Sequence, residues 1–247
     1  MQQPNYDVLN ICESAEVSNG IFRLSVKGKF NPRPGQFYMV RGWKNEPLLS
    51  RPLSVHDADD ERIRFLYQLK GQGTDSLSKL GEGRCVELLG PLGNGFDTDR
   101  FKGKVAVVAG GIGIAPMLYT VKKLKGAEVD VYAGFREDVY AIDEIKKHVK
   151  NVYVATENGR YGYKGYVTEI FSPWEYNAVL CCGPEIMMER IVKMCNDYAT
   201  PVYVSLESHM ACGIGACLVC TCKTVDGNKR TCKDGPVFSG REVILSV

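Results

Sequence analysis

The stretch Val105-Ala-Val-Val-Ala-Gly-Gly-Ile-Gly-Ile-Ala-Pro116 joins a continuous apolar run to a glycine-rich loop. The run Val105–Ala109 predicts a strand that is buried on both faces of a parallel sheet. The loop departs from the G-x-G-x-x-G fingerprint, but its glycines would let the backbone approach a pyrophosphate at the start of a helix. Proline suits the first turn of that helix. The nucleotide contacts predicted in this loop are Gly110, Gly111, Gly113 and Pro116.

Downstream of this stretch, short apolar runs alternate with amphipathic segments. Helical spacing over 185–198 places Met188, Ile191, Val192 and Cys195 on one face. Strands that alternate with helices predict a nucleotide-binding α/β unit with a parallel sheet, at residues 101–200. The further predicted elements are strands at 129–133, 152–155 and 178–182, and helices near 139–149 and 185–198.

Upstream of the stretch, the first hundred residues show short strands separated by turns that contain glycine or proline. Ile21–Val26 alternates in polarity, and the turn Arg33-Pro-Gly35 precedes another apolar run. Strands at this spacing predict an antiparallel barrel over residues 1–100, with Pro91–Phe96 as the boundary. The other strand-like runs lie at 37–40, 53–55, 63–67 and 86–89.

Residues 201–247 are rich in glycine and cysteine and show neither helical nor strand periodicity. Three cysteines have the C-x4-C-x2-C spacing of plant-type [2Fe–2S] proteins, and a fourth follows from a separate segment. Structural zinc is the alternative, but zinc loops usually pair one C-x2-C with another. Cys222 would be a spare thiol, and His209 a structural residue. The predicted metal ligands are Cys212, Cys217, Cys220 and Cys232.

A second motif, Arg51-Pro-Leu-Ser54, opens a predicted barrel strand. An arginine beside a backbone turn can pair with a pyrophosphate, and Ser54 can hydrogen-bond a flavin ring. Gly71-x-Gly73-Thr74 adds small residues and backbone donors for phosphate oxygens. Each motif alone also fits a surface arginine or a glycine turn. Together and in this order, they resemble the FAD-binding barrel of the ferredoxin–NADP reductase superfamily.

In that superfamily, a loop like Gly110–Pro116 follows the first strand of the NAD(P) domain. Phe135-Arg136 matches a position that meets the adenosine half of the dinucleotide. Cys182-Gly183-Pro184 resembles the Cys-Gly-Pro motif that lies against the nicotinamide, so the resemblance implies catalytic positions for Cys182 and Ser54. The acidic residues after Arg136 favour NADH, whereas Arg136 itself favours a 2′-phosphate, and the choice between NADH and NADPH stays open.

The order of barrel, α/β unit and cysteine loop resembles the electron-transfer subunits of dihydroorotate dehydrogenase B over essentially the whole chain. The most specific stretches are Met210–Lys223 and Cys232–Phe238. The resemblance implies an oxidoreductase subunit of pyrimidine biosynthesis that relays electrons between NAD(H), FAD, a [2Fe–2S] cluster and the FMN of a dihydroorotate-oxidising catalytic subunit, in a two-plus-two heterotetramer. The FAD contacts that it implies are Arg51, Pro52, Leu53, Ser54, Leu66, Tyr67, Gln68, Gly73 and Thr74.

Two other functions stay open at the level of sequence. The small subunit of an NADH-dependent ferredoxin–NADP oxidoreductase, or of a related hydrogenase complex, shares the three-part order. A redox-sensing or electron-carrier module without hydride chemistry is the second alternative, but the intact Arg51–Ser54 and Gly110–Pro116 motifs argue against it.

Charge and hydropathy exclude two classes of partner. The chain of 247 residues has 31 Lys+Arg against 29 Asp+Glu, a net charge of +2, and no long run of one sign. We therefore expect no nucleic-acid partner. No apolar stretch approaches the roughly 18 residues of a membrane span, so we expect no membrane partner. The amino terminus lacks a basic-then-apolar signal pattern, which predicts a cytoplasmic protein.

Overall fold

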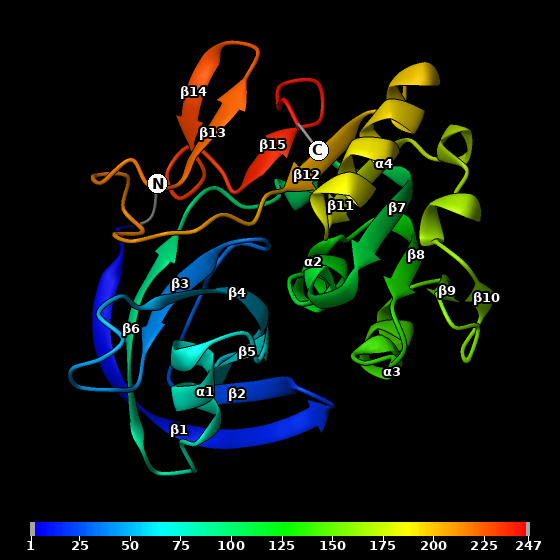
Figure 1. Cartoon of the computed structure of the whole chain (residues 1–247). Coiled ribbons are helices and arrows are strands. Elements are labelled where there is room, and N and C mark those ends of the chain that lie inside the picture. Colours follow the sequence, from blue (N-terminus) through cyan, green and yellow to red (C-terminus); the bar gives the residue numbers. More distant parts are fainter. Residues whose placement is uncertain (1–2, 246–247) are drawn as a thin grey trace.

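Six antiparallel strands close into a barrel in the order β1-β2-β5-β4-β3-β6. The computed structural model describes residues 3–245, and Figure 1 shows this barrel in blue to cyan. Apolar residues at alternate positions fill its interior, among them Leu24, Val55, Phe65 and Leu88, as the period of two predicts. The strands are β1 (Asn5–Ser18), β2 (Ile21–Lys27), β3 (Phe37–Arg41), β4 (Arg51–Ala58), β5 (Arg62–Gln68) and β6 (Cys85–Leu92).

A seven-stranded sheet forms the second unit, in the order β10-β9-β8-β7-β11-β12-β15. Its neighbouring strands are parallel, except that β15 pairs antiparallel with β12. Alternate residues of β7 belong to different apolar clusters, Val105 and Val107 to one and Ala106 and Val108 to the other. The prediction of burial on both faces is confirmed. The strands are β7 (Gly103–Gly110), β8 (Ala127–Phe135), β9 (Asn151–Thr156), β10 (Tyr163–Lys164), β11 (Ala178–Cys182), β12 (Val202–Ser205) and β15 (Val237–Ser239).

Helices connect these strands. α2 (Met117–Lys123) follows β7, and α4 (Glu185–Asp197) buries the predicted face of Met188, Ile191, Val192 and Cys195. The helix predicted near 139–149 is shorter in the structure. It consists of α3 (Ile142–Ile145) and a 3-10 turn, because Ala141 before it has a φ of 62° and Val149 after it is extended. A fourth helix, α1 (Gln72–Ser78), lies between β5 and β6.

The carboxyl-terminal segment crosses above the barrel and then returns to the sheet (Figure 1). Its cysteine loop leads into the hairpin of β13 (Thr221–Thr224) and β14 (Gly227–Arg230). β12 and β15 both come from the predicted third region, yet they extend the sheet of the second. The sheet thus contains strands from both sides of residue 200. The domain boundaries at residues 100 and 200 remain predictions from the sequence. No helix within residues 3–245 is long and apolar enough to cross a membrane.

The barrel and the α/β unit share an apolar boundary. Tyr119 of α2 is only 1% exposed and packs into the apolar cluster of the barrel. Its hydroxyl donates a hydrogen bond to the carbonyl of Pro32, at 3.1 Å. In the other direction, Leu66 and Phe96 pack into the apolar cluster of the α/β unit. Each unit therefore completes the core of the other.

Candidate functional site

A pocket of about 370 Å³ lies between the barrel and the chain that follows β12. β4 and β5 are adjacent antiparallel strands, so the start of one and the end of the other face the same opening. The structure brings eight of the nine predicted FAD residues to its walls: Arg51, Pro52, Leu53, Ser54, Leu66, Tyr67, Gln68 and Thr74. The ninth, Gly73, is buried against the side chain of Arg51.

One feature of this pocket, referred to below as the flavin pocket, fits the pyrophosphate of FAD. A β-carbon on Gly73 would lie 2.3 Å from Nε of Arg51, so the guanidinium occupies the space that only glycine leaves free. The hydroxyl of Tyr67 is buried and has no hydrogen-bond partner among the described residues. Burial raises the pKa of Tyr67, so that hydroxyl is a donor. The cation of Arg51 suits a pyrophosphate, whereas the Tyr67 ring packs in the apolar cluster of the barrel.

Two larger pockets meet at the glycine-rich loop. One, of about 610 Å³, is lined by Phe135 and Arg136 at the end of β8. The other, of about 580 Å³, is lined by Gly110–Gly113 and by Gly183 and Pro184. Gln68 lines both of them and the flavin pocket as well. The predicted nucleotide loop therefore opens directly onto the predicted flavin site.

The glycine-rich loop meets the Cys-Gly-Pro segment because β7 and β11 are parallel neighbours. A β-carbon on Gly113 would lie 2.4 Å from the carbonyl oxygen of Cys182. Ligands of open α/β sheets bind at such carboxyl-terminal strand ends. Pro116 is buried at the amino-terminal cap of α2, rather than in a pocket wall.

The Cys182 side chain lies behind the pocket wall. It is 2% exposed and packs in the apolar cluster of the α/β unit. Burial, together with the nearby carboxylate of Glu207, raises the pKa of this thiol well above its ordinary value, although a hydrogen bond with Ser205 opposes the shift. Cys182 is therefore a neutral thiol, and its catalytic position stays a prediction.

The four predicted ligands lie in two pairs. Sγ of Cys212 accepts hydrogen bonds from the backbone N–H groups of Ala216, at 3.3 Å, and Cys217, at 3.4 Å. Burial raises the pKa of Cys212, but these donors and that of Ile214 outweigh it and lower the pKa to about 6. Both cysteines are free thiols, and the thiol of Cys217 donates a further hydrogen bond to Sγ of Cys212. Backbone N–H donors stabilise the negative charge on sulfur, so these contacts favour the thiolate form of Cys212, which is the form that binds metal.

The second pair is Cys220 and Cys232, two free thiols, of which Cys232 donates a hydrogen bond to Cys220. Sγ of Cys220 accepts the backbone N–H of Cys232, at 3.4 Å. Within residues 3–245, no three His, Cys, Asp or Glu side chains converge on one metal position. Two irons with two thiolates each need four cysteines grouped in pairs, so this donor set fits a [2Fe–2S] cluster. Cys222 instead lines the 580 Å³ pocket.

The flavin pocket and the cysteines share an apolar wall. Phe37 and Met210 line the flavin pocket. The same two residues belong to the apolar cluster that contains Cys220 and Cys232. The predicted flavin site therefore lies between the nucleotide loop on one side and the buried pair Cys220 and Cys232 on the other.

Sequence reasoning missed several wall residues of these pockets. Lys70 and the segment 206–210 line the flavin pocket. The segment follows β12, so it lies at the same sheet edge as Gly110 and Gly183. The rule that ligands bind at this edge would have drawn attention to it, had β12 been among the predicted strands.

Comparison with known proteins agrees with this arrangement. Residues 207–244 match the iron–sulfur cluster binding domain of dihydroorotate dehydrogenase B. The chain is 56% identical over 241 residues to the dihydroorotate dehydrogenase B (NAD(+)) electron transfer subunit of Clostridium acetobutylicum, and the matched residues make up 98% of each chain.

Two solved structures share the fold. One is a chain of an NADH-dependent reduced ferredoxin–NADP oxidoreductase described for flavin-based electron bifurcation, with a TM-score of 0.85, 28% identity, and coverage of 96% of this chain and 90% of that one. A ferredoxin NADP+ reductase from Neisseria gonorrhoeae with bound FAD and NADP matches 78% of this chain and 91% of its own, with a TM-score of 0.63 and 16% identity. At 56% identity over nearly its full length, the chain belongs to the family of dihydroorotate dehydrogenase B electron transfer subunits.

Proposed function

We propose that this chain is the electron transfer subunit of an NAD-dependent dihydroorotate dehydrogenase of pyrimidine biosynthesis. It binds FAD in the flavin pocket, holds a [2Fe–2S] cluster on Cys212, Cys217, Cys220 and Cys232, and uses NAD(H) as co-substrate. A flavin supplies the exchange between the electron pair of a nicotinamide and the single electrons of an iron–sulfur cluster. Its partner is the FMN-containing catalytic subunit that oxidises dihydroorotate, in a two-plus-two heterotetramer.

The central position of the flavin pocket supports this proposal most directly. The pocket shares Gln68 with both nucleotide pockets and shares Phe37 and Met210 with the apolar cluster around Cys220 and Cys232. A carrier that exchanges electrons with two different sites must be close to both. In this chain the flavin pocket shares wall residues with both neighbouring sites, so it meets that requirement.

Residue roles follow from this placement. Arg51 holds the pyrophosphate of FAD, Ser54 binds its polar groups, Tyr67 forms part of the pocket wall, and Gly110–Gly113 with Gly183 and Pro184 receive the dinucleotide. Phe135 and Arg136 form the adenosine end of the site. We further propose a cytoplasmic location, because clustered ligand cysteines need a reducing compartment.

The second candidate is a subunit of a ferredoxin–NADP oxidoreductase complex, because one chain of such a complex shares the fold. That chain is 28% identical to this one, whereas the dihydroorotate dehydrogenase relative is 56% identical. An anaerobic pull-down of the tagged chain, followed by flavin analysis of the eluate, separates the two. FMN together with FAD, and formation of orotate and NADH from dihydroorotate and NAD, are the expected results. A partner with additional iron and FAD, and no orotate formation, would support the second candidate instead.

The isolated chain provides a second test. We expect the purified holoprotein to oxidise NADH with an artificial acceptor and to leave dihydroorotate unchanged, because the base for proton abstraction belongs to the catalytic partner. Turnover of dihydroorotate by the isolated chain would contradict this division of labour.

A further inference from the structure

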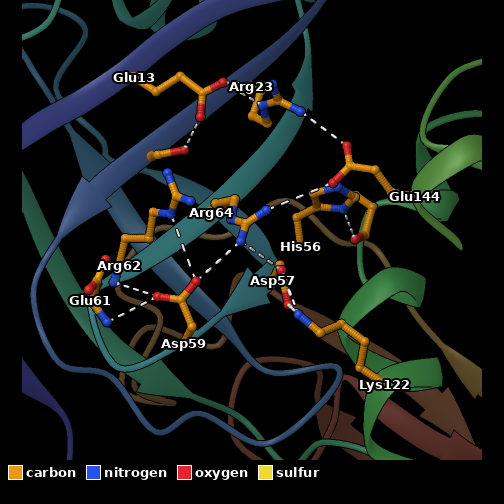
Figure 2. A network of polar contacts seen from close by, with 12 residues as sticks. Glu13, Arg23, His56, Asp57, Asp59, Glu61, Arg62, Arg64, Lys122 and Glu144 are labelled. Carbon is orange, nitrogen blue, oxygen red and sulfur yellow. Dashed lines mark hydrogen bonds and ion pairs between the residues drawn. The ribbon is translucent and has the colours of Figure 1, made fainter. Parts of the chain in front are cut away.

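A network of charged side chains joins the strand that carries the flavin motif to the helix that follows the nucleotide loop (Figure 2). At its centre is Asp57 of β4, whose side chain is 2% exposed. Its carboxylate accepts hydrogen bonds from Nζ of Lys122, at 2.7 and 2.9 Å. It also pairs with Arg64 of β5, at 3.1 Å. Lys122 lies in the last turn of α2.

The other end of α2 is attached to the same strand. His56, next to Asp57, is 1% exposed, and its Nδ1 lies 2.7 Å from the carbonyl oxygen of Ala115. A carbonyl only accepts, so Nδ1 is the donor. Ala115 directly precedes Pro116 and α2, and it lines the flavin pocket. β4 therefore contacts α2 at both of its ends, through two consecutive residues.

A third contact comes from α3. The carboxylate of Glu144 accepts a hydrogen bond from Arg23 of β2, at 3.0 Å, and pairs with Arg64, at 3.8 Å. Glu13 of β1 binds the far side of Arg23, at 2.6 Å. α3 lies beside α2 rather than along it (Figure 1), so the three contacts do not lie on one line. Three such points fix the orientation of one rigid body against another.

The position of these contacts along the chain gives them a consequence for the reaction. Ser54, which lines the flavin pocket, precedes His56 by two residues in one strand. The register of β4 shifts between Val55 and Asp57, and such an irregularity interrupts the alternation of side chains, so the consecutive residues His56 and Asp57 can both reach the α/β unit. Gly110–Ile114, which line or support the nucleotide pocket, lead directly into Ala115 and α2. The network thus links the strand that carries Ser54 to the segment that follows the nucleotide loop.

We propose that His56, Asp57, Lys122 and Glu144 are positioning residues that hold the nucleotide loop in register with the flavin pocket for hydride transfer. This inference rests on the proposed function. In the step that they position, the C4–H bond of NADH breaks, and the hydride carries both electrons to N5 of the flavin. NAD+ is left, and no further proton is required for balance. A displacement of about 1 Å can slow such a step as much as 10²-fold.

Single-turnover reduction of the FAD-loaded protein by NADH tests the proposal. In Lys122→Met we expect the rate at saturating NADH to fall on the order of 10- to 10²-fold. The half-saturating NADH concentration should change little, since the pocket walls are intact. The isotope effect with C4-deuterated NADH should increase, and the charge-transfer absorbance between NAD+ and reduced flavin should weaken. Lys122→Arg, which retains the cation, should restore most of the rate.

Two further variants keep the test decisive. Lys125→Met removes a cation from an exposed neighbouring position and should reduce flavin at the wild-type rate. Glu144→Gln breaks the half-exposed third contact, so it should fold and show a smaller decrease in the same direction as Lys122→Met.

The outcomes separate this inference from the proposed function. Wild-type rates and charge-transfer absorbance in both Lys122→Met and Glu144→Gln would overturn the positioning role. Loss of FAD from Lys122→Met, with FAD retained in Lys125→Met, would also overturn it, because the network would then build the flavin site itself. A wild-type protein that binds FAD but does not oxidise NADH would instead contradict the proposed function.

Discussion

Arg51 and Gly73 interlock in the wall of the flavin pocket, where a β-carbon on the glycine would lie 2.3 Å from Nε of the arginine. The strand that supplies the cation and the helix that supplies backbone donors therefore meet without space for a methyl group. The same guanidinium packs over the ring of Trp43, at 5.4 Å from its centroid. Arg51, which lines the flavin pocket, therefore contacts both Gly73 and Trp43.

Gly73→Ala is expected to displace Arg51 and to weaken FAD binding. A charge-assisted hydrogen bond is worth about 1.5–3 kcal/mol, so the Kd for FAD should rise roughly 10- to 100-fold. Fluorescence titration of the apoprotein with FAD measures this change. Gly81→Ala is the matched control, since a β-carbon there meets no atom within 4 Å. Equal FAD affinity in both variants would show that Arg51 does not bind the pyrophosphate.

Gly113→Ala is expected to impair NADH oxidation while FAD remains bound. The new β-carbon would lie 2.4 Å from the carbonyl oxygen of Cys182 and 2.6 Å from the α-carbon of Gly183. Both are backbone atoms, so the loop must move away from the strand end. Because a shift of about 1 Å can cost 10²-fold, kcat/KM for NADH should fall 10-fold or more. An unchanged kcat/KM with normal flavin absorbance would place the dinucleotide elsewhere.

Cys222→Ser is expected to retain the cluster, whereas Cys220→Ser should lose it. Cys222 lines the 580 Å³ pocket, and Cys220 pairs with Cys232 in the apolar cluster beside the flavin pocket. Iron and sulfide analysis, with the electron paramagnetic resonance of the reduced protein, distinguishes the two variants. A normal cluster in Cys220→Ser and none in Cys222→Ser would reassign the third ligand from Cys220 to Cys222.

The sequence predicts the elements whose signal is local. The continuous apolar run in β7 depends only on neighbouring residues, and its predicted burial on both faces is confirmed. β1 was not predicted, because Tyr6 and Val8 face solvent and a register shift between Ile11 and Glu13 breaks the period of two. A strand with a bulge and an exposed apolar start carries no alternating pattern.

The network around Asp57 depends on packing between units, which no local pattern encodes. His56 would be a surface residue of an isolated barrel. In the structure α2 covers it. Lys122 and Glu144 occupy helix positions that are usual for solvent-exposed charges, so only the docked arrangement of the two units shows that they bind partners on the barrel.

Burial of His56 leads to a prediction about pH. Burial lowers the pKa of its ring, the charge of Arg64 adds to this effect, and the carbonyl of Ala115 with the carboxylates of Glu144 and Asp57 opposes it. The folded protein therefore keeps His56 neutral at pH values where the unfolded chain, with a histidine pKa of about 6.5, takes up a proton. The stabilisation is complete above that pH and is lost as the pH falls below it, by up to about 1.4 kcal/mol per pH unit.

Urea unfolding of the holoprotein between about pH 7.5 and 5.5 measures this effect, with the pH range set by the reference histidine pKa. Wild type should lose unfolding free energy more steeply than His56→Gln, whose side chain cannot take up a proton and still offers an N–H to Ala115. The difference between the two curves isolates His56, since all other titrating groups are common to both. His148→Gln, at an exposed histidine, should follow wild type. Parallel curves for wild type and His56→Gln would mean that the ring is protonated as readily in the folded protein as in the unfolded chain, and that α2 does not seal it from water.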